Sequence, residues 1–156
     1  MNTMFDWLKP VFEGDIDTRE EILKNYSRDA SLFEVRPQVV LYPKHSKDVQ
    51  TVVRWVNDNK SRNSGLSITA RSAGTDMTGG PLGESIIMDF TRYMKAIRKV
   101  TDDYGVVEPG CFYRDFDKET RKRKRIMPTY TASREICAVG GMVANNAGGE
   151  KRCRSS

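Results

Sequence analysis

Long apolar runs, cysteine pairs and histidine are all scarce in this 156-residue chain. The apolar stretches cover only a few residues, as between Ser85 and Asp89, whereas a transmembrane helix needs about 20 consecutive apolar residues. The N-terminus has neither a basic lead nor a long apolar stretch, so no secretory signal is expected. The cysteines Cys111, Cys137 and Cys153 form no C-x-x-C pair, so neither a zinc site nor an iron–sulfur cluster is indicated. Reduced thiols in a cytoplasmic protein are expected.

The chain also has little excess charge outside one segment. It carries 26 Lys and Arg against 21 Asp and Glu. Five of the positive charges lie in the basic run Arg121–Arg125, and the rest of the chain is balanced. Because nucleic-acid binders usually spread their positive charge along a face, no nucleic acid is expected as a partner. The run suits the solvated C-terminal end of a helix.

The pattern of apolar residues predicts an α+β fold with a strand–helix–strand unit. Val39–Tyr42 and the segment 66–70 are expected to be strands. Between them, Ser46 is expected to cap a helix whose buried face has the i, i+3, i+4, i+7 spacing. That face consists of Val49, Val52, Val53 and Val56.

Further elements extend this order along the chain. Asp17 is expected to cap a short helix, 86–90 and 104–107 to form strands, and 111–124 to form a helix. The expected organisation is a loosely structured lead over 1–19 and an incomplete domain over 20–156. That domain is divided into a first subdomain at 20–105 and the start of a second at 106–156.

A Gly-rich loop at 71–83 follows the second strand and suits an anion. Its small residues allow close approach, and successive backbone N–H groups in such a turn can hold a diphosphate. Arg71 could add a charge-assisted contact, and Ser72, Thr75 and Thr78 offer hydroxyls. A P-loop is excluded because Gly80-Pro81 stands where Lys and Ser/Thr should be, and the Rossmann G-x-G-x-x-G is absent. A plain surface turn stays open as the alternative.

A second segment, 131–149, is rich in small residues and backbone donors. Such a stretch can lie flat against a large cofactor, and it could equally form a tightly packed helix and turn. With Arg71–Gly80, Glu108–Gly110 and Gly140–Gly149 in this order, the chain resembles the FAD-binding domain of the vanillyl-alcohol oxidase / p-cresol methylhydroxylase type. Within that type it most resembles the FAD-linked oxidases of the D-lactate dehydrogenase and glycolate oxidase subunit group. The resemblance runs from about residue 20 to residue 151.

The resemblance implies an FAD cofactor held between the two subdomains. It assigns to the FAD diphosphate the residues Arg71, Ser72, Ala73, Gly74, Thr75 and Asp76. It assigns to the surrounding pocket, the flavin and its linker the residues Gly79, Gly80, Gly110, Ser133, Gly140, Gly141, Asn145 and Gly148. Thr75 stands where covalent relatives carry a flavin-linking histidine, and the single histidine, His45, lies outside the loop. Noncovalent FAD is therefore expected.

The same resemblance implies a function for the complete protein and the absence of catalytic residues from this part of it. Relatives continue past this motif into a substrate-binding domain that holds their catalytic residues and any metal ligands. The chain is therefore expected to be the N-terminal FAD-binding part of an oxidoreductase that takes a hydride from a 2-hydroxy acid such as D-lactate or glycolate. As a fragment it is expected to be inactive, with no catalytic or metal-binding residue of its own.

The sequence is compatible with other interpretations as well. The tail Arg152–Ser156 departs from the family's usual continuation, which suits an interrupted frame, and a second chain could complete the fold. The complete enzyme could be peripheral to a membrane. A rival from another class is a nonenzymatic nucleotide- or nucleic-acid-binding module that uses the Gly-rich loop or the basic run.

Overall fold

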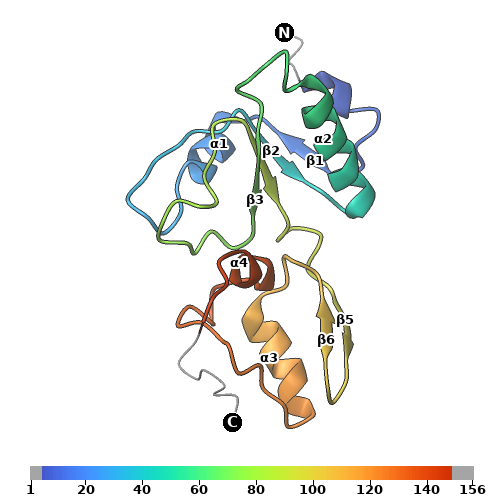
Figure 1. Cartoon of the computed structure of the whole chain (residues 1–156), viewed down its shortest axis with the longest axis vertical. Coiled ribbons are helices and arrows are strands. Elements are labelled where there is room, and N and C mark those ends of the chain that lie inside the picture. Colours follow the sequence, from blue (N-terminus) through green and yellow to red (C-terminus); the bar gives the residue numbers. More distant parts are fainter. Residues whose placement is uncertain (1–4, 149–156) are drawn as a thin grey trace.

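A computed structural model describes residues 5–148 of the chain. Figure 1 shows two parts stacked along the long axis. We call residues 5–90 the sheet half and residues 97–148 the hairpin half, after the sheet that each contains. A short linker, 91–96, joins them. The predicted α+β class is confirmed, because helices flank a mixed sheet in the first half and a hairpin in the second.

The sheet half is built on four strands in the order β1-β2-β4-β3. The strands are β1 (Asp15–Asp17), β2 (Val39–Tyr42), β3 (Ile68–Arg71) and β4 (Ile86–Asp89). β2 and β3 both run parallel to β4, whereas β1 is antiparallel to β2. The central strands β2 and β4 are buried along their whole length, as their apolar runs require.

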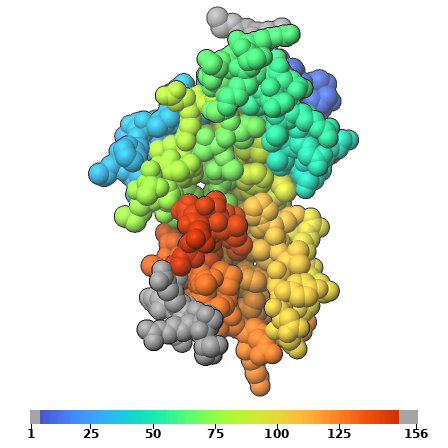
Figure 2. Space-filling view, viewed as in Figure 1, coloured from blue at the N-terminus to red at the C-terminus, as the bar shows by residue number. Residues whose placement is uncertain are grey.

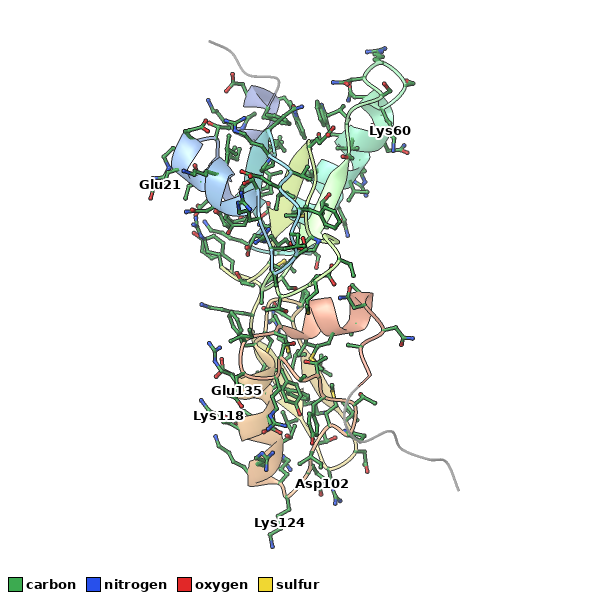
Figure 3. All side chains as sticks on the ribbon, turned by 90° about the vertical axis from the view of Figure 1, so that its left-hand side faces the viewer. Glu21, Lys60, Asp102, Lys118, Lys124 and Glu135 are labelled. Atoms are coloured by element: carbon green, nitrogen blue, oxygen red, sulfur yellow. The ribbon has the colours of Figure 1, made fainter. Side chains whose placement is uncertain are left out.

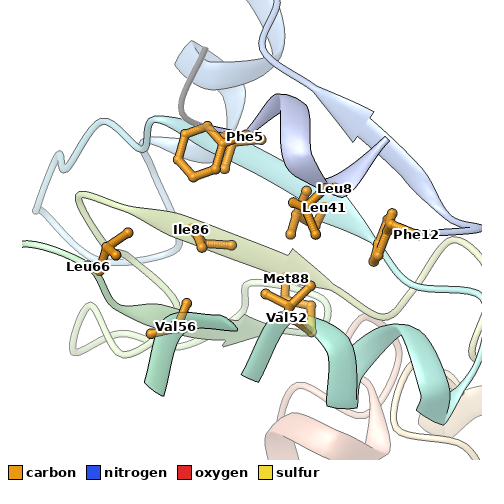
Figure 4. Packing of buried hydrophobic residues seen from close by; sticks show 10 residues of the cluster. Phe5, Leu8, Phe12, Leu41, Val52, Val56, Leu66, Ile86 and Met88 are labelled. Carbon is orange, nitrogen blue, oxygen red and sulfur yellow. The ribbon is translucent and has the colours of Figure 1, made fainter. Parts of the chain in front are cut away.

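Helices cover the two faces of this sheet. On one face α2 (Ser46–Asn59) and the short helix η1 (Asp6–Leu8) pack on Leu41 and Met88. On the other face α1 (Glu20–Tyr26) packs on Val40 and Ile87. Figure 4 shows Leu8 beside Leu41 and Val52 of α2 beside Met88. The sheet half therefore has apolar packing on both sides.

The predicted face and cap of α2 are partly wrong. Val52 and Val56 are buried and Val49 packs against the core, but Val53 is 49% exposed. Trp55 packs there instead, and its ring stacks on Trp7 with the centroids 4.2 Å apart. The helix is capped by His45, whose Nδ1 accepts from the Asp48 amide at 3.3 Å, because Ser46 already lies inside the first turn.

The N-terminal segment is also more ordered than expected. Phe5, Leu8 and Phe12 are buried in the core, so residues 5–16 are not a loose lead. Phe5, Leu8 and Phe12 stand at i, i+3 and i+7, the spacing of one helical face, so the sequence carried a signal that the expectation of a loose lead overlooked. The Asp17 cap is wrong as well, because Asp17 belongs to β1 and accepts a bond from Arg19 Nη2 at 2.6 Å.

The hairpin half contains two strands and two helices. β5 (Ile97–Val100) pairs antiparallel with β6 (Gly105–Val107), and α3 (Tyr113–Lys122) and α4 (Val139–Ala144) follow. β5 was not predicted because it alternates only weakly. The division expected after residue 105 runs through this hairpin; Ile97 and Val107 pack in one cluster, so the change of packing lies near residue 95.

Among residues 5–148, no helix is long and apolar enough to cross a membrane. The same residues contain no group of three or more histidine, cysteine, aspartate or glutamate side chains that could hold a metal ion. Cys111 and Cys137 are buried free thiols. Cys153, Gly149 and the tail Arg152–Ser156 lie outside the described residues.

Candidate functional site

A hollow of about 350 Å³ lies where the two halves meet. Its walls are the loop after β3, residues 72–81, and the segment 131–147 that contains α4. Figure 1 shows α4 directly below the sheet half, and in Figure 2 the red segment around α4 lies against the yellow-green loop. The two motifs that sequence analysis singled out thus form one site. The predicted residues that line it are Ser72, Ala73, Gly74, Thr75, Asp76, Gly80, Ser133, Gly141 and Asn145.

The loop wall offers backbone donors. Among the hydrogen bonds of residues 5–148, none is donated by the amides of residues 72–77. Gly74 and Gly79 have φ values of +66° and +85°, a region that side-chain-bearing residues rarely adopt. Turns of this kind direct successive N–H groups to one side and create a site for an anion. This finding supports the anion-binding loop over a plain surface turn.

Asp76 organises the second turn of this loop. Its Oδ2 accepts from the Thr78 hydroxyl at 2.6 Å, the Gly80 amide at 2.8 Å and the Thr78 amide at 3.1 Å. Its Oδ1 accepts from Asn145 Nδ2 at 2.7 Å. The bond from the Thr78 hydroxyl is the largest cause that lowers the pKa of Asp76 to about 2, and the bonds from Gly80 and Asn145 add to it. The carboxylate is therefore ionised at neutral pH.

The Pro109 carbonyl connects the two walls of the hollow. It accepts from the Ser72 hydroxyl at 3.1 Å and from the Gly140 amide at 2.8 Å. A Cβ at Gly140 would lie 2.7 Å from the same oxygen, so only glycine allows this approach. Glu108–Gly110, the middle motif of the resemblance, is thus the joint on which both walls rest.

Five predicted residues do not line the hollow: Arg71, Gly79, Gly110, Gly140 and Gly148. Gly110 and Gly140 act at the joint, and Gly148 is exposed with nothing near its Cβ position. The Arg71 guanidinium donates to the carbonyls of Arg28 at 2.8 Å and Tyr26 at 3.3 Å, and burial lowers its pKa. Arg71 thus supports the loop through the carbonyls of Tyr26 and Arg28. It also packs closely on Gly74, where a Cβ would lie 2.6 Å from Arg71 Nη2.

Sequence reasoning named the segment 131–149 but missed several of its lining residues. Thr131, Cys137, Ala138, Met142, Ala144 and Ala147 also face the hollow. The Cys137 sulfur lies 3.3 Å from the Thr131 hydroxyl oxygen. Apart from Met142 they are small, and their small size and their place in the motif were the available signals. Which side of α4 faces the loop depends on packing against Pro109, which no local pattern encodes.

The remaining candidates lie away from the hollow. His45 caps α2 in the sheet half. In the basic run, Arg121 pairs with Asp117 and Lys122 with Glu119 on α3, and Arg123 pairs with Asp102. Figure 3 shows Lys118, Lys124 and Asp102 in the lower part of the molecule, far from the junction of the halves. This charge distribution gives no support to a nucleic-acid-binding module.

Known proteins match this arrangement in sequence. The family model described as an FAD binding domain matches residues 37–156. D-2-hydroxyglutarate dehydrogenase of Stutzerimonas stutzeri (strain A1501) is 29% identical over 161 residues, covering 97% of this chain and 32% of the relative. The Escherichia coli (strain K12) D-2-hydroxyglutarate dehydrogenase is 26% identical, covering 89% and 14%. D-lactate dehydrogenase of Anaerostipes hadrus is 24% identical, covering 94% and 30%.

Solved structures agree in fold. An alkyldihydroxyacetonephosphate synthase matches with a TM-score of 0.75 at 16% identity, over 92% of this chain and 29% of that one. A p-cresol methylhydroxylase with substrate bound matches with a TM-score of 0.68 at 21% identity, over 85% and 26%. The chain spans 14% to 32% of the length of the curated relatives named above. The resemblance inferred from the three motifs is confirmed: the chain belongs to the FAD-binding domain family of FAD-linked oxidoreductases.

Proposed function

We propose that this chain supplies the FAD-binding part of a flavin-dependent dehydrogenase that oxidises a 2-hydroxy acid. The observation that carries the proposal is the loop at 72–77, whose amides have no acceptor within the described chain and which lines a hollow at the junction of the halves. The substrate class comes from the relatives, which are named as D-2-hydroxyglutarate and D-lactate dehydrogenases.

The residues present fit an FAD diphosphate. The amides of 72–77 and the Thr75 hydroxyl supply donors, and no lysine is needed where backbone N–H groups form an anion site. The hollow lies at the low end of the range of about 300–1,000 Å³ for small-molecule sites, so it suits part of an extended dinucleotide. Gly141 and Ala144, which carry no side chain beyond a methyl group, line the wall opposite the loop. Bound FAD would accept the hydride, and this chain's residues would bind and orient it.

The hollow contains little that could move a proton for catalysis. Of its lining residues, Asp76 and Cys137 are the titratable ones in the described chain. The Asp76 oxygens already accept four hydrogen bonds, and the Cys137 sulfur is buried against Thr131. A general base needs hydrogen-bond reach to the substrate proton. We therefore propose that the chain on its own binds FAD and does not oxidise a hydroxy acid.

A titration with FAD tests the binding proposal. We expect saturable quenching of flavin fluorescence by the wild-type chain. The variant Ala73→Asp, which places a negative charge in the loop, should weaken binding by about tenfold or more, equivalent to about 1.4 kcal/mol. Ala30→Asp, at an exposed position away from the hollow, is the matched control and should bind like the wild type. Equal binding by all three chains, or by none, would contradict the proposal.

The attachment of the cofactor is tested separately. Thr75 lines the hollow, and a threonine cannot form the histidine–flavin bond of covalent relatives. We expect the FAD to be released when the loaded protein is denatured, and mass spectrometry to find the unmodified chain. A chain mass increased by that of the flavin would show that the attachment is covalent.

A further inference from the structure

The walls of the hollow are joined at two points. The first is the Pro109 carbonyl, to which the Ser72 hydroxyl and the Gly140 amide both donate. Gly140 fits so closely there that its Cβ position lies 2.9 Å from Ser72 Oγ. This contact joins the start of the loop to the start of α4, so the later residues of the two walls need a second contact to hold them together.

The second point is the bond between Asp76 Oδ1 and Asn145 Nδ2, 2.7 Å long. It joins residues 69 positions apart in sequence. Asn145 is held in place because its amide donates to Gly141 at 3.0 Å, and the left-handed Asn146 lets Ala147 donate to Met142 at 2.9 Å. Asp76 is held by the donors of Thr78 and Gly80. Both ends of this bond are therefore anchored in their own wall.

We propose that Asp76 and Asn145 are positioning residues, whose hydrogen bond sets the width of the hollow, and that Asp76 does not contact the FAD diphosphate. The inference rests on the proposed function for the identity of the ligand. Each Asp76 oxygen already has a donor from this chain, and its charge has the same sign as a diphosphate. A carboxylate in a phosphate-binding loop is therefore useful for the shape that it gives the loop.

Two substitutions separate the hydrogen bond from the charge. Asn145→Ala removes the bond between the walls and leaves the loop contacts of Asp76 intact. Asp76→Asn keeps an acceptor for Gly80 and gains an amide that can donate to Asn145, because an asparagine amide can turn over. This variant keeps the connection and loses the negative charge. Asp76→Ala removes both.

Hydrogen exchange of the chain without FAD tests the connection directly. We expect Asn145→Ala to speed exchange of the Thr78 and Gly80 amides several-fold, because the loop edge loses its anchor. Asp76→Asn should speed this exchange less than Asn145→Ala does, because it keeps the connection between the walls and loses only the charge. Wild-type exchange in Asn145→Ala would overturn the proposal. Asn145 is exposed, and circular dichroism checks that each variant keeps its fold.

FAD titration of the same variants tests the positioning role. Asn145→Ala should weaken binding about three- to tenfold, the range expected for one lost hydrogen bond. Asp76→Asn should bind as tightly as the wild type or more tightly, since repulsion is removed. The double variant Asp76→Ala/Asn145→Ala should bind no more weakly than Asp76→Ala alone, because the two residues share one interaction.

The opposite pattern identifies a direct contact. If Asp76→Asn and Asp76→Ala weaken binding equally while Asn145→Ala has no effect, Asp76 binds the cofactor itself and the inference fails. Failure of the proposed function is distinguishable, because a wild-type chain that binds no FAD still reports on the Asp76–Asn145 bond through hydrogen exchange.

Discussion

The two halves of the molecule hold their shape by different means. In the sheet half, Val39, Leu41, Ile86 and Ile87 are fully buried, and helices cover both faces. In the hairpin half, β5 and β6 stay partly exposed, and the core is a small cluster around Tyr113, Phe116 and two cysteines. The hollow lies between them. Its loop wall belongs to the half with the large apolar core, and its α4 wall belongs to the half with the small one.

This difference shows what a wall made of small residues requires. Glycine and alanine bury little apolar surface, so α4 gains little stability from its own packing. Its place is set by the buried Met142 side chain, by backbone contacts with Cys111 and Pro109, and by the Asn145 side chain. A cofactor can then approach the backbone closely, at the cost of a wall that depends on its neighbours.

Truncation of a core side chain should lower the free energy of unfolding more than any other change, and the loss should differ between the two halves. Leu41→Ala should lower the free energy of unfolding by about 2–5 kcal/mol, since a fully buried leucine leaves a cavity under two covering elements. Met142→Ala should cost less, because Met142 lies at the edge of the hollow and its neighbours can relax. Urea unfolding of both variants measures this, and equal costs would mean that the halves are packed alike.

The joint between the halves should be the next most sensitive place. A Cβ at Gly110 would overlap the Phe90 carbonyl oxygen and lie 2.8 Å from that of Met94. Gly110→Ala should therefore cost about 1–3 kcal/mol, the usual range for overpacking, and should also weaken FAD binding. Gly65→Ala is the control, since its Cβ would lie 3.4 Å from Asn63 Oδ1 in an exposed turn. Unchanged stability of Gly110→Ala would mean that the joint can open freely.

The same contrast explains which parts of the fold could be predicted from the sequence. β2 and β4 are short apolar runs, and their pattern gave strands close to the observed ones. β5 was not predicted, because Arg98 and Lys99 interrupt its apolar pattern. It forms a strand by pairing with β6. The N-terminal core residues Phe5, Leu8 and Phe12 do have the i, i+3, i+7 spacing, but the helix there, η1, has only three residues, and their burial comes from packing against the sheet.

For the site, the sequence motifs predicted where it lies but not which side-chain contacts form it. The Gly-rich loop and the segment around α4 do meet at one hollow. The role of Arg71 was not predictable from charge, because its guanidinium turns to the Tyr26 and Arg28 carbonyls, which are far away in sequence. The Asp76–Asn145 bond likewise joins segments that only the fold brings together.

Lowering the pH should reduce the free energy of unfolding by a smaller amount, through protonation of Asp76 in the hollow. The pKa of Asp76 is about 2 in the folded chain against its ordinary 3.8, so the folded state binds fewer protons between these values. Its stabilisation is present above pH 3.8 and is lost as the pH falls towards 2. Because Asp76 is close to solvent, we expect less than about 1 kcal/mol. Urea midpoints of wild type and Asp76→Asn should converge on acidification; a constant gap would contradict this.

The smallest effect should come from a strained residue at the end of α3. The non-glycine residues with positive φ in the described chain, Lys124 and Asn146, both lie in the hairpin half. Lys124, at φ +57°, follows the last turn of α3, where the Arg125 amide donates to Thr120 and the Lys124 amide to Arg121. This is the helix ending that glycine favours.

Lys124→Gly should therefore stabilise the chain by about 0.5–1 kcal/mol, although it removes a positive charge. Lys118→Gly, in the middle of the same helix, should cost about 1 kcal/mol, because glycine there loses more backbone entropy without relieving a left-handed residue. If thermal unfolding shows a higher stability for Lys124→Gly and a lower stability for Lys118→Gly, the backbone strain lies at Lys124. Destabilisation by both variants would mean that the side chain of Lys124 stabilises the chain by more than its left-handed backbone conformation costs.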